Sequence, residues 1–236
     1  MNNIILSLYR STINMAIPVL LVALGGTITH HAGIINVAME GLMLAAAFSA
    51  VVFSYISGSA LVGVTAAILT AVIFSMFYSF FVTTLKTNNF AIGFALNIFI
   101  SSFTLYLSRI MFPGENAFNS PKIAAIPRLS INFGAKILND LFSNYSILVY
   151  STIFLVFAVS YVIYKTPFGL WLRAAGSQPD ALNKAGKKVS VIRYIASVLT
   201  GVLCGLAGAQ LSLSNVVLFT KDMSGGRGFI ALAIIL

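Results

Sequence analysis

Six long apolar stretches constrain the fold of this chain more than any other feature of its sequence. A membrane-spanning helix needs about 20 predominantly apolar residues, and such segments recur along the whole length. We therefore predict an all-α fold, a polytopic transmembrane helical bundle of six to seven membrane segments that forms a single transmembrane domain over residues 1–236. The six predicted spans are Ile13–Ile28, Ile34–Ile56, Leu61–Leu85, Phe90–Phe112, Tyr145–Tyr164 and Val191–Leu213.

The two ends of this pattern are less regular. The first predicted span is short, and an earlier start near Ile4 stays open. A seventh apolar run opens at Phe229 and reaches Leu236, and its eight residues are too few to cross the hydrocarbon core. We therefore expect a protein that is incomplete at its C-terminus.

The composition excludes several classes of protein. Hydrophobic residues make up 59% of the chain and charged residues only 8%, which leaves too little polar surface to cover a soluble globule. The net charge of +9 does not indicate nucleic-acid binding, because the basic residues lie in loops. Cys204 is the only cysteine, so a disulfide framework is excluded. His30 and His31 lack a third ligand, and we expect neither a metal site nor a cofactor.

The distribution of charge predicts which loops face the cytoplasm. The segment Lys165–Arg193 carries six Lys or Arg residues against one acid and so holds +5 of the net charge. Short loops rich in Lys and Arg stay inside. The segment Pro113–Asn144 has a net charge of only +1, and we place it outside, with a short amphipathic helix predicted over residues 133–141. Counting single crossings puts His30-His31 inside and the N-terminus outside.

Start and stop signals divide the loop 165–193 into two short helices. Thr166-Pro167 is a suitable start, because Thr can cap a helix and Pro loses no hydrogen bond at the first helical position. Gly176 is a suitable stop. The second helix is predicted over Pro179–Ala185, and Gly186 ends it.

The second of these helices has the features of a docking surface. Asp180 complements its positive end, and Ala181 and Ala185 lie one turn apart on a small-residue face. A helix this short is unstable alone in water, so it must be held by its neighbours and by whatever it touches. A solvated connecting loop would need neither capped helices nor an alanine face, and we favour docking.

Two polar residues, Asn36 and Glu40, fall within the second predicted span. Their i,i+4 spacing can place them on one helical face. An acid near the middle of a membrane helix costs about 3 kcal/mol, so Glu40 should face protein or water. Two interpretations stay open: a polar pathway or moving contact, and a structural carboxylate bonded to Asn36 and nearby backbone. The flanking Gly33 and Gly41 favour an interrupted helix of the kind that transporters use.

Other residues in the apolar runs allow weaker inferences. For Asn97 and Gln210 we favour a role in bridging helices. Phe90, Phe94 and Tyr106 could stack on a base or a sugar, but contact with lipid or other helices is the favoured interpretation. Small residues every four positions in the sixth span predict close helix packing; they are Gly201, Gly205 and Ala209.

Three blocks of sequence carry a resemblance to a known family. Residues 33–41 read G-I-I-N-V-A-M-E-G, Thr166–Gly186 contains T-P-F-G, R-A-A-G and a final A-G, and residues 223–233 read M-S-G-G-R-G-F-I-A-L-A. They resemble the early segment, the cytoplasmic coupling loop and a later helix start of permease subunits of ATP-binding-cassette (ABC) importers. This is the branch that handles simple sugars, nucleosides and branched-chain amino acids. Leu96-Asn97 is similar to a pair in the nucleoside subgroup, whereas Lys187-Lys188 departs from the usual apolar residues.

The resemblance implies a function and a set of partners. The chain would be a permease subunit that imports nucleosides or simple sugars in the plasma (inner) membrane of a bacterium. A separate ATPase subunit would bind the coupling loop and hydrolyse ATP, a second identical or sister permease would complete the path, and an extracytoplasmic binding protein would deliver cargo. Coupling would involve Arg173, Gly176, Pro179, Asp180, Ala181, Ala185 and Gly186, and the pathway Asn36, Glu40 and Asn97.

Alternatives remain within and beyond this class. The same blocks fit a permease for ribose-like sugars or branched-chain amino acids. An ion-coupled secondary transporter would need several intramembrane ionisable residues, and Glu40 is the only acid firmly inside a predicted span. A scaffold without cargo would need no ATPase. No Walker A sequence and no arrangement of nucleophile, base and acid is present, so we do not expect an enzyme.

Overall fold

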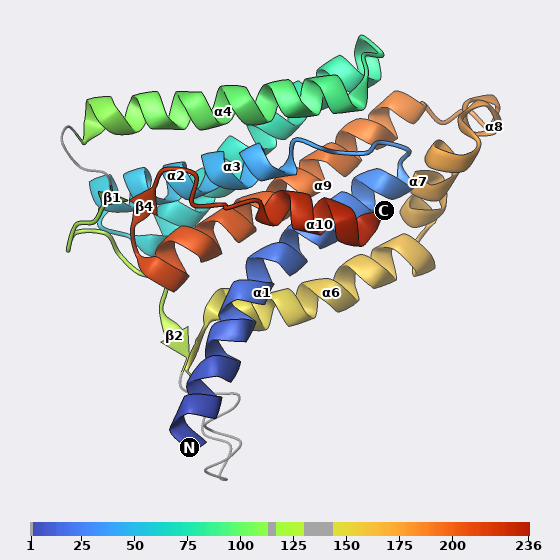
Figure 1. Ribbon diagram of the computed structural model, residues 1–236. Coiled ribbons are helices and arrows are strands. Elements are labelled where there is room, and N and C mark those ends of the chain that lie inside the picture. Colours follow the sequence, from blue (N-terminus) through green and yellow to red (C-terminus); the bar gives the residue numbers. More distant parts are fainter. Residues whose placement is uncertain (1, 113–116, 130–143) are drawn as a thin grey trace.

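The computed structural model describes residues 2–112, 117–129 and 144–236, and this part of the chain is a bundle of helices (Figure 1). The predicted amphipathic helix at 133–141 lies outside the described residues. Within them, six helical segments are long and apolar enough to cross a membrane, as predicted. The helices are α1 Asn2–His31, α2 Met39–Ser57, α3 Ala60–Ser79, α4 Asn89–Met111, α6 Ile147–Lys165, α7 Pro167–Ser177, α8 Pro179–Lys184, α9 Val189–Ala209 and α10 Arg227–Ile235.

Short elements extend or connect these helices. Two π-helical segments, Phe80–Thr84 and Gln210–Val216, continue α3 and α9. Two small antiparallel ribbons pair β1 with β4 and β2 with β3. Their strands are β1 Ala117–Phe118, β2 Arg128–Leu129, β3 Tyr145–Ser146 and β4 Phe219–Thr220.

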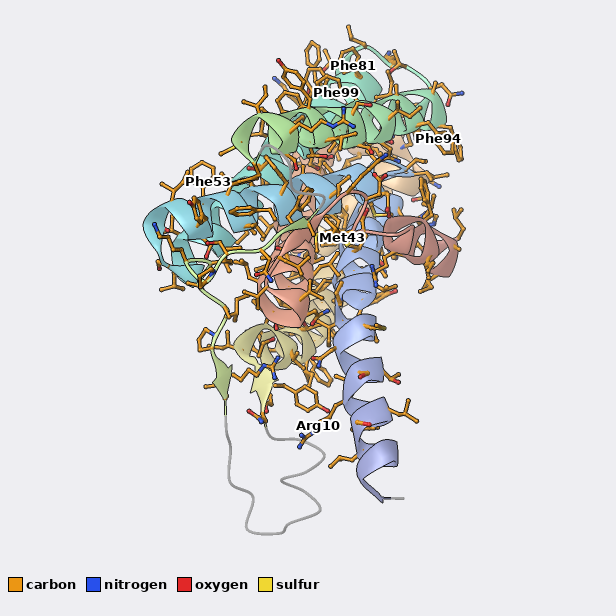
Figure 2. The ribbon with its side chains drawn as sticks, turned by 60° about the vertical axis from the view of Figure 1, so that its left-hand side comes forward. Arg10, Met43, Phe53, Phe81, Phe94 and Phe99 are labelled. Carbon is orange, nitrogen blue, oxygen red and sulfur yellow. The ribbon has the colours of Figure 1, made fainter. Side chains whose placement is uncertain are left out.

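Helix α2 forms the centre of the bundle. In its most apolar stretch, 78% of the residues are buried, against 22% in α6 and in α3 with its π-helical extension. Helix α2 packs against α3, α4, α9 and α10. Met43 of α2 is fully buried, whereas Phe99 of α4 is exposed on the outside of the bundle (Figure 2). Because the outer faces of α3, α4 and α6 are apolar and exposed, these faces suit contact with lipid or with another membrane subunit.

The segments predicted to share one side of the membrane lie at one end of the bundle. Ala32, after α1, accepts a hydrogen bond from Nε of Arg193 (3.2 Å), and Thr84 and Tyr194 share a hydrogen bond of 2.6 Å. Both ribbons lie at the other end, away from α7 and α8 (Figure 1). The six long helices therefore alternate in direction, as expected from single crossings of the membrane (Figure 1).

The second predicted span began too early. Ile34–Ile56 was expected to be helical, but α2 starts at Met39 and residues 34–38 are not helical. Asn36 and Glu40 therefore do not share a helical face, and that prediction is wrong. The reason is local, because the side chain of Asn36 accepts a hydrogen bond from the N–H of Ala38 (3.0 Å), which offers the backbone an alternative to the helix.

Helix α1 begins at Asn2, in agreement with the earlier start that stayed open for the first span, since no Gly or Pro interrupts the residues before Ile13. Three other boundaries differ from the predictions. Helix α9 ends at Ala209, where the π-helical segment takes over. Gly176 does not stop α7, which runs on to Ser177, and the predicted second helix ends at Lys184, with Ala185 as its C-cap residue. The predicted caps at Thr166 and Gly186 are present.

Glycines allow α9 to pack closely on α3. A Cβ atom on Gly205 would lie 2.6 Å from Cα of Ile68, and one on Gly201 would lie 2.8 Å from Cα of Val72. Ala209, one turn beyond Gly205, is fully buried. Because both close contacts are with backbone, a side chain at either glycine forces the helices apart.

We expect Gly205→Val to destabilise the bundle by about 1–3 kcal/mol, the usual range for overpacking a core. The midpoint of thermal unfolding of the purified protein in detergent measures this effect. Thr65→Val is the control, because it places the same side chain at an exposed position of α3 and removes only a hydrogen bond to the carbonyl of Val62. An unchanged midpoint for Gly205→Val would contradict the close α3–α9 contact.

Candidate functional site

A break in the chain between α1 and α2 is the first feature of the candidate site. Gly33 turns the chain with φ of +79°, a conformation that favours glycine. The N–H of Ile34 donates to the carbonyl of Thr29 (2.9 Å), and the hydroxyl of Tyr78 in α3 donates to the carbonyl of Ile35 (2.8 Å). Nδ2 of the buried Asn36 has no hydrogen-bond partner among the described residues.

Asn97 of α4 holds the start of α2 in place. Its Oδ1 accepts a hydrogen bond from the N–H of Gly41 (2.8 Å), and its Nδ2 donates to the carbonyl of Val37 (2.9 Å). These two backbone groups are among those that a helix start leaves unpaired. Asn97 therefore bridges two helices, and it does so at the interruption.

Glu40 joins the start of α2 to the start of α10. Its carboxylate accepts hydrogen bonds from the N–H groups of Gly226 (2.9 Å) and Gly228 (2.6 Å), the N-cap and second positions of α10. A negative group suits the positive end of a helix. A Cβ on Gly228 would lie 2.5 Å from Cα of Glu40, so only glycine permits this approach. Glu40 therefore forms hydrogen bonds with α10. It does not form one with Asn36, which was the side-chain partner expected in the structural interpretation.

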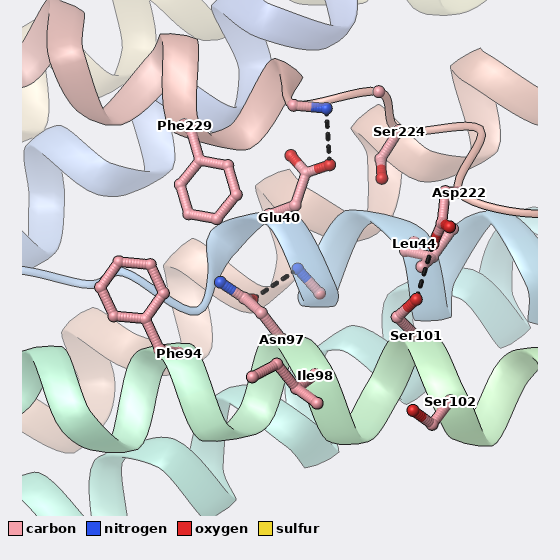
Figure 3. A pocket seen from close by; sticks show the side chains of 13 residues that line it. Glu40, Leu44, Phe94, Asn97, Ile98, Ser101, Ser102, Asp222, Ser224 and Phe229 are labelled. Atoms are coloured by element: carbon pink, nitrogen blue, oxygen red, sulfur yellow. Dashed lines mark hydrogen bonds between the residues drawn. The ribbon is translucent and has the colours of Figure 1, made fainter.

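A cavity of about 370 Å³ lies between α2, α4 and α10 (Figure 3). Glu40 and Asn97 line it, so the structure brings two of the three predicted pathway residues together, whereas Asn36 is not part of the lining. A volume of this size is within the range of small-molecule sites. The remaining lining residues are Gly41, Leu44, Phe94, Ile98, Ser101, Ser102, Asp222, Ser224, Gly225, Gly226 and Phe229.

The two ends of the cavity differ in chemistry. At one end the rings of Phe94 and Phe229 stack, with centroids 6.1 Å apart and an interplanar angle of 28°. At the other end Ser101 donates a hydrogen bond to Oδ1 of Asp222 (2.6 Å), and Ser102 lies one residue further along α4. The described lining contains two carboxylates and no basic side chain. The cavity therefore suits a neutral ligand with a flat apolar part and a hydroxyl-bearing part.

The predicted coupling loop lies at the end of the bundle where α1 ends. Gly176 contacts that end closely, because a Cβ on it would overlap the carbonyl oxygen of His31 and lie 3.0 Å from the nitrogen of Gly33. Arg173 lies over the ring of Tyr164, 5.6 Å from its centroid. This loop is therefore packed against the segment that leads to Glu40.

Helix α8 presents the residues that the sequence singled out. Pro179 occupies its first turn and Asp180 is the acid of that turn. Ala181 and Ala185 are exposed, while Leu182 is buried and holds the helix to the bundle. Gly186 has φ of +78° and terminates the helix.

The comparison with known proteins identifies the family. The model of the family described as the permease component of the branched-chain amino acid transport system matches residues 8–236. The chain belongs to this family. It is 28% identical to the guanosine ABC transporter permease protein NupQ of Bacillus subtilis, over 94% of this chain and 72% of the relative. No solved structure matches significantly.

Two further relatives of the permease are named for different cargo. The nucleoside ABC transporter permease protein NupC of Lactococcus lactis is 27% identical over 98% of this chain and 76% of its own length. A Haloferax volcanii protein, TsgC13, whose name assigns it provisionally to glucose transport, is 26% identical over 97% and 69%. The permease is thus a multi-pass membrane transport subunit.

Sequence reasoning missed part of the cavity in this permease. Ser101, Ser102, Asp222 and Phe229 were not predicted as site residues. Asp222 lies in a loop outside the apolar runs. The only sequence signal that could have identified it is its position directly before residues 223–233, one of the three blocks that resemble the family. Phe94 was considered as a stacking residue but set aside, because nothing in the sequence pairs it with Phe229 across 135 positions.

Proposed function

We propose that this permease is the membrane-spanning subunit of an ABC importer that admits nucleosides through the cavity between α2, α4 and α10. The observation that carries the proposal is the polarity of the cavity, with a stacked aromatic pair at one end and Ser101 with Asp222 at the other. A nucleoside has the same division into a flat base and a hydroxyl-bearing sugar. The relatives named for guanosine and nucleosides support this choice.

The charge of the cavity favours nucleosides over branched-chain amino acids. An amino acid is a zwitterion, and its ammonium group could pair with Glu40 or Asp222, but the described lining offers no cation to bind its carboxylate. An unpaired charge in such a site is unfavourable. Simple sugars are neutral and remain the second candidate, because the relative TsgC13 is named for glucose.

The energy source in this proposal is a separate ATPase subunit that binds the loop 165–193 from the cytoplasm of a bacterial cell. The excess of Lys and Arg in this loop supports its cytoplasmic placement. Arg173, Gly176, Pro179, Asp180, Ala181, Ala185 and Gly186 form or support the docking surface. A second permease subunit faces the open side of the cavity, and an extracytoplasmic binding protein delivers the cargo.

Transport by the assembled complex tests this proposal. The permease is purified with its ATPase and binding protein, reconstituted in proteoliposomes, and supplied with radiolabelled guanosine, uridine, ribose, glucose or leucine. We expect ATP-dependent, saturable uptake of the nucleosides. Uptake of only glucose or leucine would overturn the cargo assignment. Uptake that follows an ion gradient without ATP would support the secondary-transporter alternative.

Bulky residues on the exposed face of α8 should weaken ATPase binding. We expect Ala181→Trp with Ala185→Trp to lower the recovery of the ATPase with the tagged permease about tenfold, which corresponds to about 1.4 kcal/mol. The reason is that both side chains are exposed and would obstruct a close helix contact. Ala181→Ser with Ala185→Ser keeps the face small and serves as the matched control. Equal recovery for both variants would remove α8 from the docking surface.

A further inference from the structure

The polar end of the cavity contains a carboxylate with a free acceptor. Oδ1 of Asp222 accepts the hydrogen bond from Ser101, whereas Oδ2 has no hydrogen-bond partner among the described residues. Asp222 adopts φ of +50°, a left-handed conformation that glycine, asparagine and aspartate adopt more readily than other residues. This acid lines the cavity and is held by a serine of another element.

A pair of neighbouring hydroxyl groups matches this carboxylate. A carboxylate has acceptor sites on both oxygens and can accept two O–H donors at once. Ser101 occupies one of these sites and fixes the orientation of the group, which leaves the other oxygen for a ligand hydroxyl (Figure 3). A phosphate would be repelled by Asp222 and Glu40, so the complement is a neutral diol.

The aromatic end lies at a suitable distance from the diol-binding end. Phe94 and Ser101 are seven residues apart on α4, which places them about 10 Å apart along the helix. This length accommodates a base joined to a pentose. The rings of Phe94 and Phe229 are 50% and 38% exposed, so they have room to part and admit a flat base, and aromatic rings stack favourably on such groups.

We propose that Asp222, oriented by Ser101, binds the 2′,3′-diol of a ribonucleoside while Phe94 and Phe229 contact the base. This inference rests on the proposed function and deepens it. The permease itself then discriminates between ribonucleosides and 2′-deoxyribonucleosides, in addition to any selection by the binding protein. A ligand without the 2′-hydroxyl group loses one of its hydrogen bonds to the exposed Asp222 carboxylate, so it binds this end of the cavity less well.

The test compares guanosine with 2′-deoxyguanosine in proteoliposomes that contain the complete complex. The binding protein is saturated with either nucleoside, so that its own preference does not enter. We expect the wild-type protein to transport guanosine at least about tenfold faster. We expect Asp222→Asn to lower the guanosine rate about tenfold and to leave the 2′-deoxyguanosine rate within about twofold, which removes the discrimination.

Two variants separate a specific role of Asp222 from a structural one. Asp222→Asn keeps an oxygen that can accept from Ser101, and asparagine tolerates positive φ, so the fold of the loop is preserved. Ser101→Ala should reduce the discrimination as well, because Asp222 loses its orienting bond. Ser108→Ala, two turns further along α4 and outside the lining, serves as the control and should change neither rate.

The experiment distinguishes failure of the diol assignment from failure of the proposed function in nucleoside transport. Equal rates for both nucleosides in the wild-type protein would overturn the diol assignment, and so would an equal fall of both rates in Asp222→Asn. In both cases nucleoside transport itself stands. No nucleoside uptake by the wild-type complex, with uptake of glucose or leucine, would overturn the proposed function and the diol assignment together.

Discussion

Replacing Glu40 with alanine is expected to lower ATP-dependent uptake by about 100-fold or more. The carboxylate accepts two backbone hydrogen bonds at the start of α10, from Gly226 and Gly228. Hydrogen bonds to charged groups contribute about 1.5–3 kcal/mol each, and alanine leaves both donors unpaired. A destabilisation of about 3 kcal/mol or more shifts a two-state equilibrium by over 100-fold, so α10 would leave its place beside α2 in most molecules.

Hydrogen exchange locates this effect more directly than uptake does. In Glu40→Ala, the amides of Gly226 and Gly228 should lose protection, while amides in the middle of α9 keep theirs. Glu40→Gln retains one acceptor oxygen, but its NH₂ group faces a donor, so we expect an intermediate loss. Ser49→Ala in the same helix, whose hydroxyl bonds only within α2, is the control. Wild-type uptake and protection in Glu40→Ala would contradict the role of this carboxylate.

The spans and the two loop helices of this protein could be predicted from sequence because their causes are local. The second to sixth apolar runs meet the length requirement of the bilayer by themselves, and the first does so with its earlier start. The start of α7 depends on Thr166 and Pro167, which are neighbours, and the hydroxyl of Thr166 does accept a hydrogen bond from the N–H of Gly169. The length of an apolar run and the start of a helix each depend on neighbouring residues, so both can be predicted from the sequence alone.

The interruption before α2 could be suspected but not located. Gly33 and Gly41 indicated a break, yet Ile34, Ile35 and Val37 are as apolar as the residues of a span. A hydropathy profile does not reveal the turn at Asn36. It also cannot reveal that Asn97 hydrogen-bonds to the backbone of Gly41 and Val37, which lie 56 and 60 positions earlier in the chain. The position of the break is therefore set by the local turn at Asn36 together with the tertiary contacts of Asn97.

The cavity depended even more on distant contacts. Glu40 meets α10 across 186 positions, and Ser101 meets Asp222 across 121. The sequence offered an open choice between a pathway role and a structural role for Glu40. The geometry shows the structural role, because the carboxylate bonds the start of α10, and it places the same carboxylate in the lining of the cavity, where the pathway role stays a prediction.

The coupling loop and the cavity are linked through one close backbone contact. Gly176 in the last turn of α7 lies against His31 and Gly33, and Gly33 begins the non-helical segment that leads to Asn36 and Glu40. Nε of Arg193 donates to the carbonyl of Ala32 beside this contact. A movement of α7 and α8 by the ATPase would therefore reach the start of α2 without passing through a flexible linker.

Lys187 makes a further contact within the coupling loop. It departs from the apolar pattern of the family, and its ammonium group lies 4.3 Å from the ring centroid of Trp171 in α7. A cation over an indole ring is attracted by about 0.5–1 kcal/mol at exposed sites. Lys187 thus adds a contact between the segment that follows α8 and the side chain of Trp171 in α7.

Replacing Gly176 with valine is expected to abolish the stimulation of ATP hydrolysis by cargo. Any Cβ at this position would overlap the carbonyl oxygen of His31 and meet the nitrogen of Gly33 at 3.0 Å. Both neighbours are backbone atoms, so α7 must move away from the segment before α2, and overpacking of this kind costs about 1–3 kcal/mol. The exposed face of α8 is untouched, so the ATPase should still be recovered with the permease.

The measurement is ATP hydrolysis by the reconstituted complex, with and without loaded binding protein. In Gly176→Val the two rates should be equal, while ATPase recovery stays at the wild-type level. Ser177→Ala, at the next position, removes an exposed hydroxyl that bonds only to the carbonyl of Arg173, and it should keep the stimulation. Full stimulation in Gly176→Val would exclude this contact as the connection between the ATPase and the cavity, because the contact cannot persist beside a valine side chain.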